Sequence, residues 1–325
     1  MSMTGTGAGP IHARLRVAPE VAAALAAHDP VVALESTLIS HGLPYPANVE
    51  VARASEAAVR AAGAIPATIA IRDGRILVGL DDAALEALAS APAGSVRKAT
   101  RPSLATALHA GGWAATTVSA TMIAAHATGI AVFATGGIGG VHRGALSRSA
   151  ADPTFDISAD LDELARTPVA VVCAGPKAIL DVAATLEYLE TRGVPVVAIG
   201  QAEMPGFYSR TSAVPAPASV ADEPAAADLV RLHLGLGLGS GILVCTPVPA
   251  DAALPEEVAR VAVERAIREA ASAGVSGPAL TPWLLARIAE LTDGASVRAN
   301  TALIVNDAAV AGRLARMLAT RLADR

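Results

Sequence analysis

Short, unbroken runs of apolar residues recur along this chain and most constrain its fold. They cover residues 31–34, 130–134, 168–173, 194–199 and 242–246. Strands that are covered on both faces read as continuous apolar runs, whereas strands with one wet face alternate apolar and polar residues. Ala- and Leu-rich segments with helical spacing separate most of these runs. We therefore expect an α/β fold in which helices cover a mostly parallel central sheet.

Composition agrees with this expectation and argues against two classes of partner. Hydrophobic residues make up 53% of the chain and aromatic residues only 2%, so Ala, Val, Leu and Ile must build the core. The net charge of −5 gives no electrostatic reason to expect binding to DNA or RNA. No run of about 18 apolar residues is present, so we expect no membrane-spanning segment. We predict an enzyme that acts on a small molecule.

The organisation of the chain favours one domain in the cytoplasm. Residues 1–14 read as a disordered leader that lacks the apolar core of a signal peptide, and residues 15–325 as a single domain. Cys173 and Cys245 lie inside apolar runs, which favours reduced, buried thiols over a disulfide. Helical spacing predicts helices over residues 47–62, 177–191, 255–273, 282–292 and 300–322.

Two shorter segments have distinct signatures. Two β-rich runs, residues 66–71 and 75–78, flank Asp73-Gly74 and predict a small β-hairpin. Residues 213–228 are rich in Pro and Ala, and we expect them to form an exposed loop.

Lys177 is notable for its position after a buried strand. It follows Ala174-Gly175-Pro176, and we expect it at the head of the helix 177–191. A cation in the first turn of a helix faces the positive end of the macrodipole, and burial disfavours the charged amine further. Both effects would raise the fraction of neutral amine, the form that attacks carbon. The alternative interpretation is that Lys177 is an ordinary charged lysine on the solvated surface.

Carboxylates occupy two further positions of interest. Glu35 ends the first apolar run, at the edge where open α/β sheets collect ligands. There it is either a buried proton donor with a raised pKa or a strand-end carboxylate in water. Residues 155–163 carry four carboxylates around a helix start that Ser158 can cap. These acids either complement the helix dipole, or Asp156 holds a divalent cation through waters while Asp160 faces a sugar.

Two glycine-rich stretches, residues 135–142 and 235–241, would let a ligand approach the backbone closely. Neither matches a P-loop, and neither is a good dinucleotide fingerprint. His142, Lys98 and Arg101 are then candidates for phosphate or substrate contacts. Each of the three is also compatible with an ordinary surface position.

Long blocks of this sequence match the pattern of one enzyme family. The blocks are Ala33–Thr37 with His41–Pro46, Pro66–Ala70, Thr116–Met122, Phe133–Gly144, Phe155–Asp160, Cys173–Gly175 ahead of Lys177, Leu186–Thr191, Phe207–Arg210, Thr281-Pro282 and Asn300. Together they resemble the pseudouridine-5′-phosphate glycosidase family, which includes proteins described as indigoidine synthase A-like. The resemblance implies a three-layer α/β/α sandwich assembled as a homotrimer.

The resemblance also implies a role for each candidate residue. Lys177 would be the nucleophile, Glu35 the proton donor and Asp160 a second acid beside the sugar. Asp156 would belong to a metal site, with Mn²⁺ the expected ion. The substrate contacts would be Lys98, Val118, Ser158, Ala159, Asp160 and Asn300.

The implied reaction is the reversible cleavage of pseudouridine 5′-phosphate to uracil and ribose 5-phosphate, in pseudouridine catabolism. Ribose is joined to uracil through carbon, so protonation of a leaving heteroatom is not available. Our interpretation is that Glu35 protonates the ring oxygen as the ribose opens and Lys177 bonds to C1′. Protonation of the uracil carbon then permits cleavage, and water releases ribose 5-phosphate from an imine. Lys98 and helix-start amides would anchor the phosphate.

Three alternatives stay open, because the sequence also departs from the family pattern. Residues 100–104 read Thr-Arg-Pro-Ser-Leu where the family usually has Ser-Arg-Arg-Asp-Leu, and residues 145–154 resemble a short insertion. The alternatives are an indigoidine-synthesis A-like phosphatase, a glycosidase with another nucleobase preference, and a catalytically silent ligand-binding homologue. Retention of Glu35, Lys177 and Asp160 together argues against the last. We expect no fused kinase, since no second domain of adequate length remains.

Overall fold

The structure, a computed structural model, describes residues 11–145, 155–275 and 280–320. The first ten residues of the expected leader and nearly all of the expected insertion at 145–154 lie outside the described residues. Residues His12–Arg14 form a 3-10 turn that leads into the first strand.

The expected mostly parallel central sheet is confirmed. Within the described residues eleven strands form it, and nine of them follow the order β1-β4-β3-β2-β7-β9-β13-β11-β12. Neighbouring strands are parallel except where β3 meets β4 and β6. Their bounds are β1 Leu15–Val17, β2 Val31–Leu34, β3 Ile65–Arg72, β4 Arg75–Val78, β5 Arg97–Ala99, β6 Trp113–Thr116, β7 Val132–Ala134, β9 Ala170–Cys173, β11 Val196–Ile199, β12 Ala218–Val220 and β13 Ile242–Cys245.

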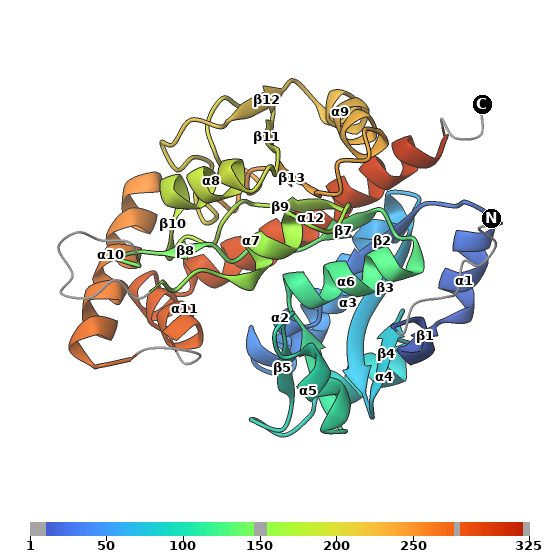
Figure 1. The fold of residues 1–325 in the computed structure, drawn as a ribbon. Coiled ribbons are helices and arrows are strands. Elements are labelled where there is room, and N and C mark those ends of the chain that lie inside the picture. The colour runs from blue at the N-terminus through green and yellow to red at the C-terminus, as the bar shows by residue number, and fades with distance from the viewer. Residues whose placement is uncertain (1–10, 146–154, 276–279, 321–325) are drawn as a thin grey trace.

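Helices cover both faces of this sheet, which makes the three expected layers (Figure 1). Side chains of a strand alternate between the faces, so Val31 and Ala33 of β2 belong to one core cluster and Val32 and Leu34 to the other. The first face is covered by α1 Pro19–Ala26, α6 Val118–Thr128, α7 Ala159–Leu164 and α8 Val182–Thr191. The second is covered by α3 Ala47–Ala61, α9 Glu223–Gly235 and α12 Ala295–Thr320.

The remaining elements lie around these layers. The long helix α12 extends past the sheet, and its first half packs with α10 Glu256–Ser272 and α11 Leu280–Leu291 (Figure 1). Smaller helices are α2 Thr37–His41, α4 Asp82–Ala89 and α5 Leu104–His109. A separate antiparallel pair joins β8 Val141–His142 to β10 Leu180–Asp181.

The predicted β-hairpin is confirmed and extends the central sheet. Strands β3 and β4 pair antiparallel, with Arg72 opposite Arg75. Asp73 and Gly74 both have positive φ, 47° and 74°, as a two-residue turn of type I′ requires.

Two sequence predictions of local structure are wrong in part. The helix expected over 177–191 begins only at Val182, because Asp181 caps it by accepting a hydrogen bond from the Ala184 amide. The segment 213–228 is not a continuous loop, since it contains β12 and the start of α9. Asp222 caps α9 by accepting from the Ala225 amide. The Pro- and Ala-rich composition of this segment suggested a loop because it shows no periodic pattern of apolar residues. Pro is nevertheless well accommodated in the first turn of a helix.

Two further predictions concern the core thiols and the membrane. Cys173 and Cys245 are free and buried, directly opposite each other on β9 and β13. None of the helices in the described part of the chain is both long and apolar enough to cross a lipid bilayer.

Candidate functional site

The candidate residues gather where several strands end. Glu35 follows β2, Thr135 follows β7 and Lys177 lies four residues after β9, and these parallel strands end at one edge of the sheet. Strand β6 runs the opposite way to β3 but ends at the same place, where the Thr116 amide donates to Ser36 Oγ at 2.9 Å. The edge therefore collects loops from segments far apart in the sequence, as expected for an open α/β sheet.

Glu35 is held rigidly at this edge. Its side chain is buried, with only 6% of the residue exposed, and its two carboxylate oxygens accept hydrogen bonds from the hydroxyls of Thr37 and Thr135. A cavity of about 10 Å³ lies beside it, which is at the lower limit for a single water. Its carboxyl group is therefore fixed by its neighbours and cannot swing away from the edge without breaking both hydrogen bonds.

Asp160 is fixed by two backbone amides. Its Oδ1 accepts from the Ser119 amide and its Oδ2 from the Gly139 amide, each at 3.0 Å, and the residue is 7% exposed. Ser158 caps α7 as predicted, accepting from the Asp160 amide at 3.3 Å. A Cβ on Gly139 would lie 2.2 Å from Ser158 Oγ and 2.8 Å from Asp160 Oδ2. The glycine-rich stretch therefore allows the backbone to reach this carboxylate.

Lys177 lies in an irregular segment and not at the head of a helix. Its amide donates to the Ile138 carbonyl at 3.2 Å, and the Ile138 amide donates to the Gly175 carbonyl at 3.2 Å. Gly175 adopts a φ of 85°, which favours glycine at this position. The residue is half-buried, so a fully solvated surface position does not describe it. The macrodipole argument made from the sequence fails, because α8 begins five residues later.

Lys98 links the candidates electrostatically. Although the residue as a whole is exposed, protein packed around its ammonium group lowers its pKa, and the positive charge of Lys177 lowers it further. The charges of Glu35 and Asp160 act in the opposite direction. Lys98 therefore lies within electrostatic reach of Lys177, Glu35 and Asp160, although the sequence positions of these four residues run from 35 to 177.

The sequence held one signal that motif reasoning missed. Its 25 basic residues include only two lysines, Lys98 and Lys177, and the other 23 are arginines. Both lysines lie in this one cluster. Arginine cannot be deprotonated in a protein, whereas a lysine amine can. The two side chains of this sequence that can act as neutral amines therefore both belong to this cluster. Thr37 and Ser119, which help to hold the two acids, were not predicted as site residues, and Thr135 and Gly139 were named only as part of the glycine-rich stretch.

Three other predicted substrate contacts lie on helices: Val118, Ala159 and Asn300. Val118 is the first residue of α6 and its side chain is in the core, so only its backbone could meet a ligand. Ala159 starts α7, and its amide belongs to the set that the first turn of a helix leaves without an intrahelical partner. Asn300 lies on α12 one turn before Ile304, which lines the small cavity beside Glu35.

Asp156 does not lie in a ready-made metal cage. Its carboxylate is 48% exposed, and its Oδ2 is 3.8 Å from Nδ1 of His142. Among the described residues no group of three or more His, Cys, Asp or Glu side chains could hold a metal ion. A hard divalent cation here would keep most of its coordination sphere as water or substrate oxygens, as small hard cations often do.

Arg101 has a structural partner. Its guanidinium forms an ion pair with Glu163, which is fully buried and also accepts a hydrogen bond from the Thr167 hydroxyl. Residues 100–104, which depart from the family pattern, also form a local hydrogen bond, from the Thr100 amide to Ser103 Oγ at 2.9 Å. Arg101 therefore ties its loop to α7, and this ion pair occupies the group that was a candidate phosphate ligand.

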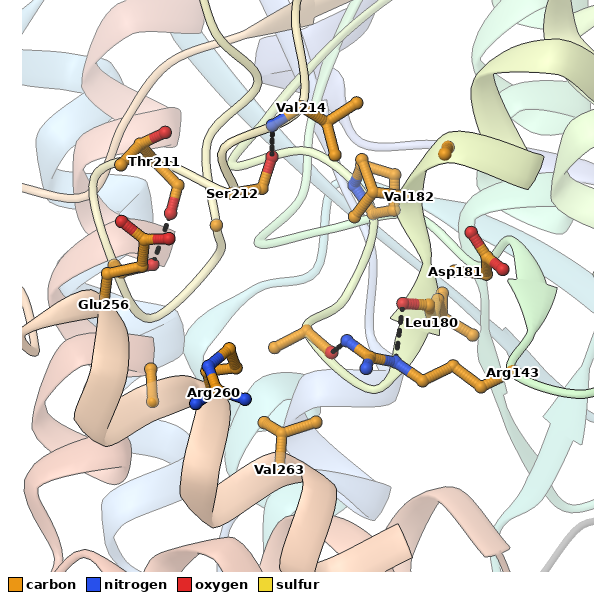
Figure 2. Close-up of a pocket in the computed structure, with 16 residues that line it drawn as sticks. Arg143, Leu180, Asp181, Val182, Thr211, Ser212, Val214, Glu256, Arg260 and Val263 are labelled. Carbon is orange, nitrogen blue, oxygen red and sulfur yellow. Dashed lines mark hydrogen bonds between the residues drawn. The ribbon is translucent and has the colours of Figure 1, made fainter.

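A cavity of about 290 Å³ borders the segment that carries Lys177 (Figure 2). Pro176 and Ala178, the neighbours of Lys177, line it, but Lys177 itself does not. Arg143, Ser212 and residues of α10 complete its wall. None of Lys98, Lys177, Glu35 and Asp160 lines this cavity.

Comparison with known proteins gives matches over nearly the whole chain. A family described as "Indigoidine synthase A like protein" matches residues 20–317. The pseudouridine-5′-phosphate glycosidase of Paracoccus denitrificans is 55% identical over 306 residues, which cover 94% of this chain and 99% of that protein. The protein of the same name from Deinococcus radiodurans is 50% identical over 305 residues, covering 94% and 95%.

Two solved structures share the fold. The prealnumycin C-glycosynthase AlnA, in complex with ribulose 5-phosphate, has a TM-score of 0.85 and 38% identity, covering 96% of this chain and 99% of AlnA. An indigoidine synthase A-like protein from Thermotoga maritima has a TM-score of 0.81 and 31% identity, covering 94% and 96%.

Proposed function

Because the chain belongs to the indigoidine synthase A-like family, as its sequence blocks indicated, we propose that it is a pseudouridine-5′-phosphate glycosidase. It would reversibly cleave the C-glycosidic bond of pseudouridine 5′-phosphate, giving uracil and ribose 5-phosphate. One observation carries the proposal: Lys98 lies within electrostatic reach of Lys177, the other lysine of the chain, and of the carboxylates Glu35 and Asp160. The names of relatives at 50–55% identity support the same reaction.

In the proposed mechanism Glu35 and Lys177 act on the two atoms of the C1′–O4′ bond. Glu35 gives its proton to the ring oxygen O4′ as the C1′–O4′ bond breaks, and the nitrogen of Lys177 bonds to C1′. A proton is then delivered to the uracil carbon, and the C–C bond breaks as the nitrogen lone pair forms a C=N bond. Water hydrolyses this imine, which frees ribose 5-phosphate and restores the amine.

The other residues bind and orient the substrate in this proposal. Lys98 attracts the phosphate, and Asp160 faces the ribose from its fixed position under the glycine-rich stretch. At the start of α7 the Ser158 amide donates to the Gly140 carbonyl and the Asp160 amide to Ser158 Oγ, so the Ala159 amide is the one that would meet an anion. Binding energy at the phosphate would position C1′ against Lys177, which is where orientation accelerates a reaction most.

We also propose a divalent cation, with Mn²⁺ the first candidate, at Asp156 and a homotrimer in solution. When bound, the cation would supply charge that helps hold a phosphorylated substrate. No chemical step is assigned to it, because Asp156 and His142 supply only two donors among the described residues. Calorimetric titration of Mn²⁺ into wild type and Asp156→Ala tests the first proposal, and sedimentation equilibrium tests the second.

The decisive experiment follows uracil and the lysine adduct together. Wild-type protein with pseudouridine 5′-phosphate and Mn²⁺ should release uracil, and Lys177→Ala should not. Borohydride added during turnover should reduce the imine and leave a ribitol phosphate adduct on the peptide that contains Lys177. Since only two lysines exist, mass spectrometry separates Lys177 from Lys98 and the N-terminal amine unambiguously.

Other products would point to the alternatives. Release of inorganic phosphate without uracil would indicate a phosphatase, and tight binding with neither product would indicate a silent homologue. An adduct found on Lys98 instead of Lys177 would overturn the assigned nucleophile while leaving the reaction class intact.

A further inference from the structure

Arg143 donates two hydrogen bonds to the segment that follows Lys177. It follows strand β8 directly. Its guanidinium donates from Nε to the Leu180 carbonyl at 3.2 Å and from Nη2 to the Ala178 carbonyl at 3.3 Å (Figure 2). These carbonyls belong to the residues one and three positions after Lys177.

The segment after Lys177 is a tight turn that offers these carbonyls outward. The Leu180 amide donates to the Lys177 carbonyl at 2.9 Å, which closes the turn 177–180. Strand β10 then pairs with β8, with Leu180 opposite His142. On the inner side, the Lys177 amide is bonded to Ile138 of the glycine-rich stretch. The turn is thus held by backbone hydrogen bonds to Ile138, by the pairing of β10 with β8, and by the side chain of Arg143.

Packing holds only part of the turn: Ile179 and Leu180 are buried in a core cluster, whereas Ala178 is only partly buried. The cavity of about 290 Å³ borders the turn, and Pro176, Ala178 and Leu180 form part of its wall. Side chains next to a void lose the contacts that would otherwise hold them in place. A planar guanidinium can bond two carbonyls at once, which a lysine ammonium in the same place does not do in a fixed geometry.

We propose that Arg143 is a positioning residue for the reaction, one that holds the Lys177 amine in register with Glu35 and Asp160 by clamping the turn 177–180. This rests on the proposed function of Lys177 as nucleophile. A displacement of about 1 Å at a reacting group can lower a rate by about 100-fold. Removal of the clamp should therefore lower kcat by about 10- to 100-fold and change KM less than threefold.

The test compares Arg143→Ala with a matched arginine. Arg260 lines the same cavity, but its guanidinium is paired with Glu257 at 2.6 Å and Glu264 at 2.8 Å on its own helix. Arg260→Ala should leave kcat and KM at wild-type values. Guanidinium ion added at millimolar concentration should restore part of the activity of Arg143→Ala, because the vacated space adjoins the cavity. It should not stimulate wild type or Arg260→Ala.

A second readout does not depend on activity. Hydrogen exchange of the amides in residues 177–181 should be at least tenfold faster in Arg143→Ala than in wild type, with no change in Arg260→Ala. If Arg143→Ala does not fold, Arg143→Gln and Arg143→Lys replace it, and kcat should rank wild type above Lys and Lys above Gln.

Opposite results would overturn the proposal. Equal kcat in wild type and Arg143→Ala, equal losses in both arginine variants, or unchanged exchange in the turn would each remove Arg143 from the positioning role. Should wild type release no uracil at all, the proposed function fails, and the exchange experiment still decides whether Arg143 holds the turn.

Discussion

Gly139→Ala tests whether Asp160 owes its position to the glycine-rich stretch. The added Cβ would lie 2.2 Å from Ser158 Oγ, 2.5 Å from Ser158 Cβ and 2.8 Å from Asp160 Oδ2. None of these contacts is tolerable, and Ser158 and Asp160 are held by the start of α7, so they cannot yield separately. The substitution should push α7 away from the stretch and break the bond from the Gly139 amide to Asp160.

The magnitude follows from these two effects. Overpacking of a filled site typically costs about 1–3 kcal/mol, and loss of a hydrogen bond to a charged group costs about 1.5–3 kcal/mol. Because relaxation that relieves the clash also breaks the bond, the two do not add fully, and we expect a loss of about 3 kcal/mol in the free energy of unfolding. Displaced Asp160 should also lower kcat/KM by about 100-fold.

Urea unfolding, followed by circular dichroism, and uracil release would measure both effects. Gly235→Ala is the matched control, because Gly235 is the last residue of α9 and a Cβ there would meet no atom within 4 Å. It should be neutral, or stabilising by about 0.5–1 kcal/mol. Unfolding midpoints of Gly139→Ala and Gly235→Ala that agree within error would refute the steric argument. Full activity in Gly139→Ala would refute the role of the amide in placing Asp160.

Three further substitutions test buried charge. Burial raises the pKa of the Asp307 carboxyl well above its usual value, with the neighbouring Cys173 thiol as a second cause. Because this folded-state pKa exceeds the unfolded value of about 3.9, Asp307 stabilises the fold most at low pH and loses that contribution as pH rises, by up to about 1.4 kcal/mol per pH unit. The stability gain from Asp307→Asn should therefore grow between pH 5 and pH 7 in urea unfolding, and a gain independent of pH would contradict this. Arg101→Ala should destabilise by about 3–5 kcal/mol, because it leaves the buried Glu163 carboxylate without its cation. Glu163→Gln should cost less, about 1–3 kcal/mol, because Arg101 can then turn to solvent. A lower thermal midpoint for Glu163→Gln than for Arg101→Ala would show that loss of the ion pair does not cause the destabilisation.

Much of the fold was predictable because its signals are local. The apolar run 31–34 became β2 with unchanged bounds, and the Asp73-Gly74 turn formed the expected hairpin. The segment around Lys177 was misread because its Ala- and Leu-rich sequence favours a helix. Backbone bonds to Ile138 and β8 compete with that preference, and a preference of less than 1 kcal/mol per residue is easily overridden.

The site could be predicted as a set of residues but not as an arrangement. The sequence pointed to Glu35, Asp160 and Lys177, and a count of lysines would have added weight to Lys98. It could not indicate that Thr135 holds Glu35, or that the Ser119 and Gly139 amides hold Asp160. These contacts join residues 21 to 100 positions apart, so no periodicity or spacing records them.

The sequence alone determined the layers and the chemical types at the sheet edge, since apolar runs, turn residues and helix caps act over a few residues. Tertiary structure decided which groups meet. It brought Lys98 within reach of Lys177, gave Arg101 a buried partner, and left a cavity behind the turn that Arg143 clamps. The physical reason is that burial, charge and clamping depend on segments distant in sequence that only the packed sheet brings into contact.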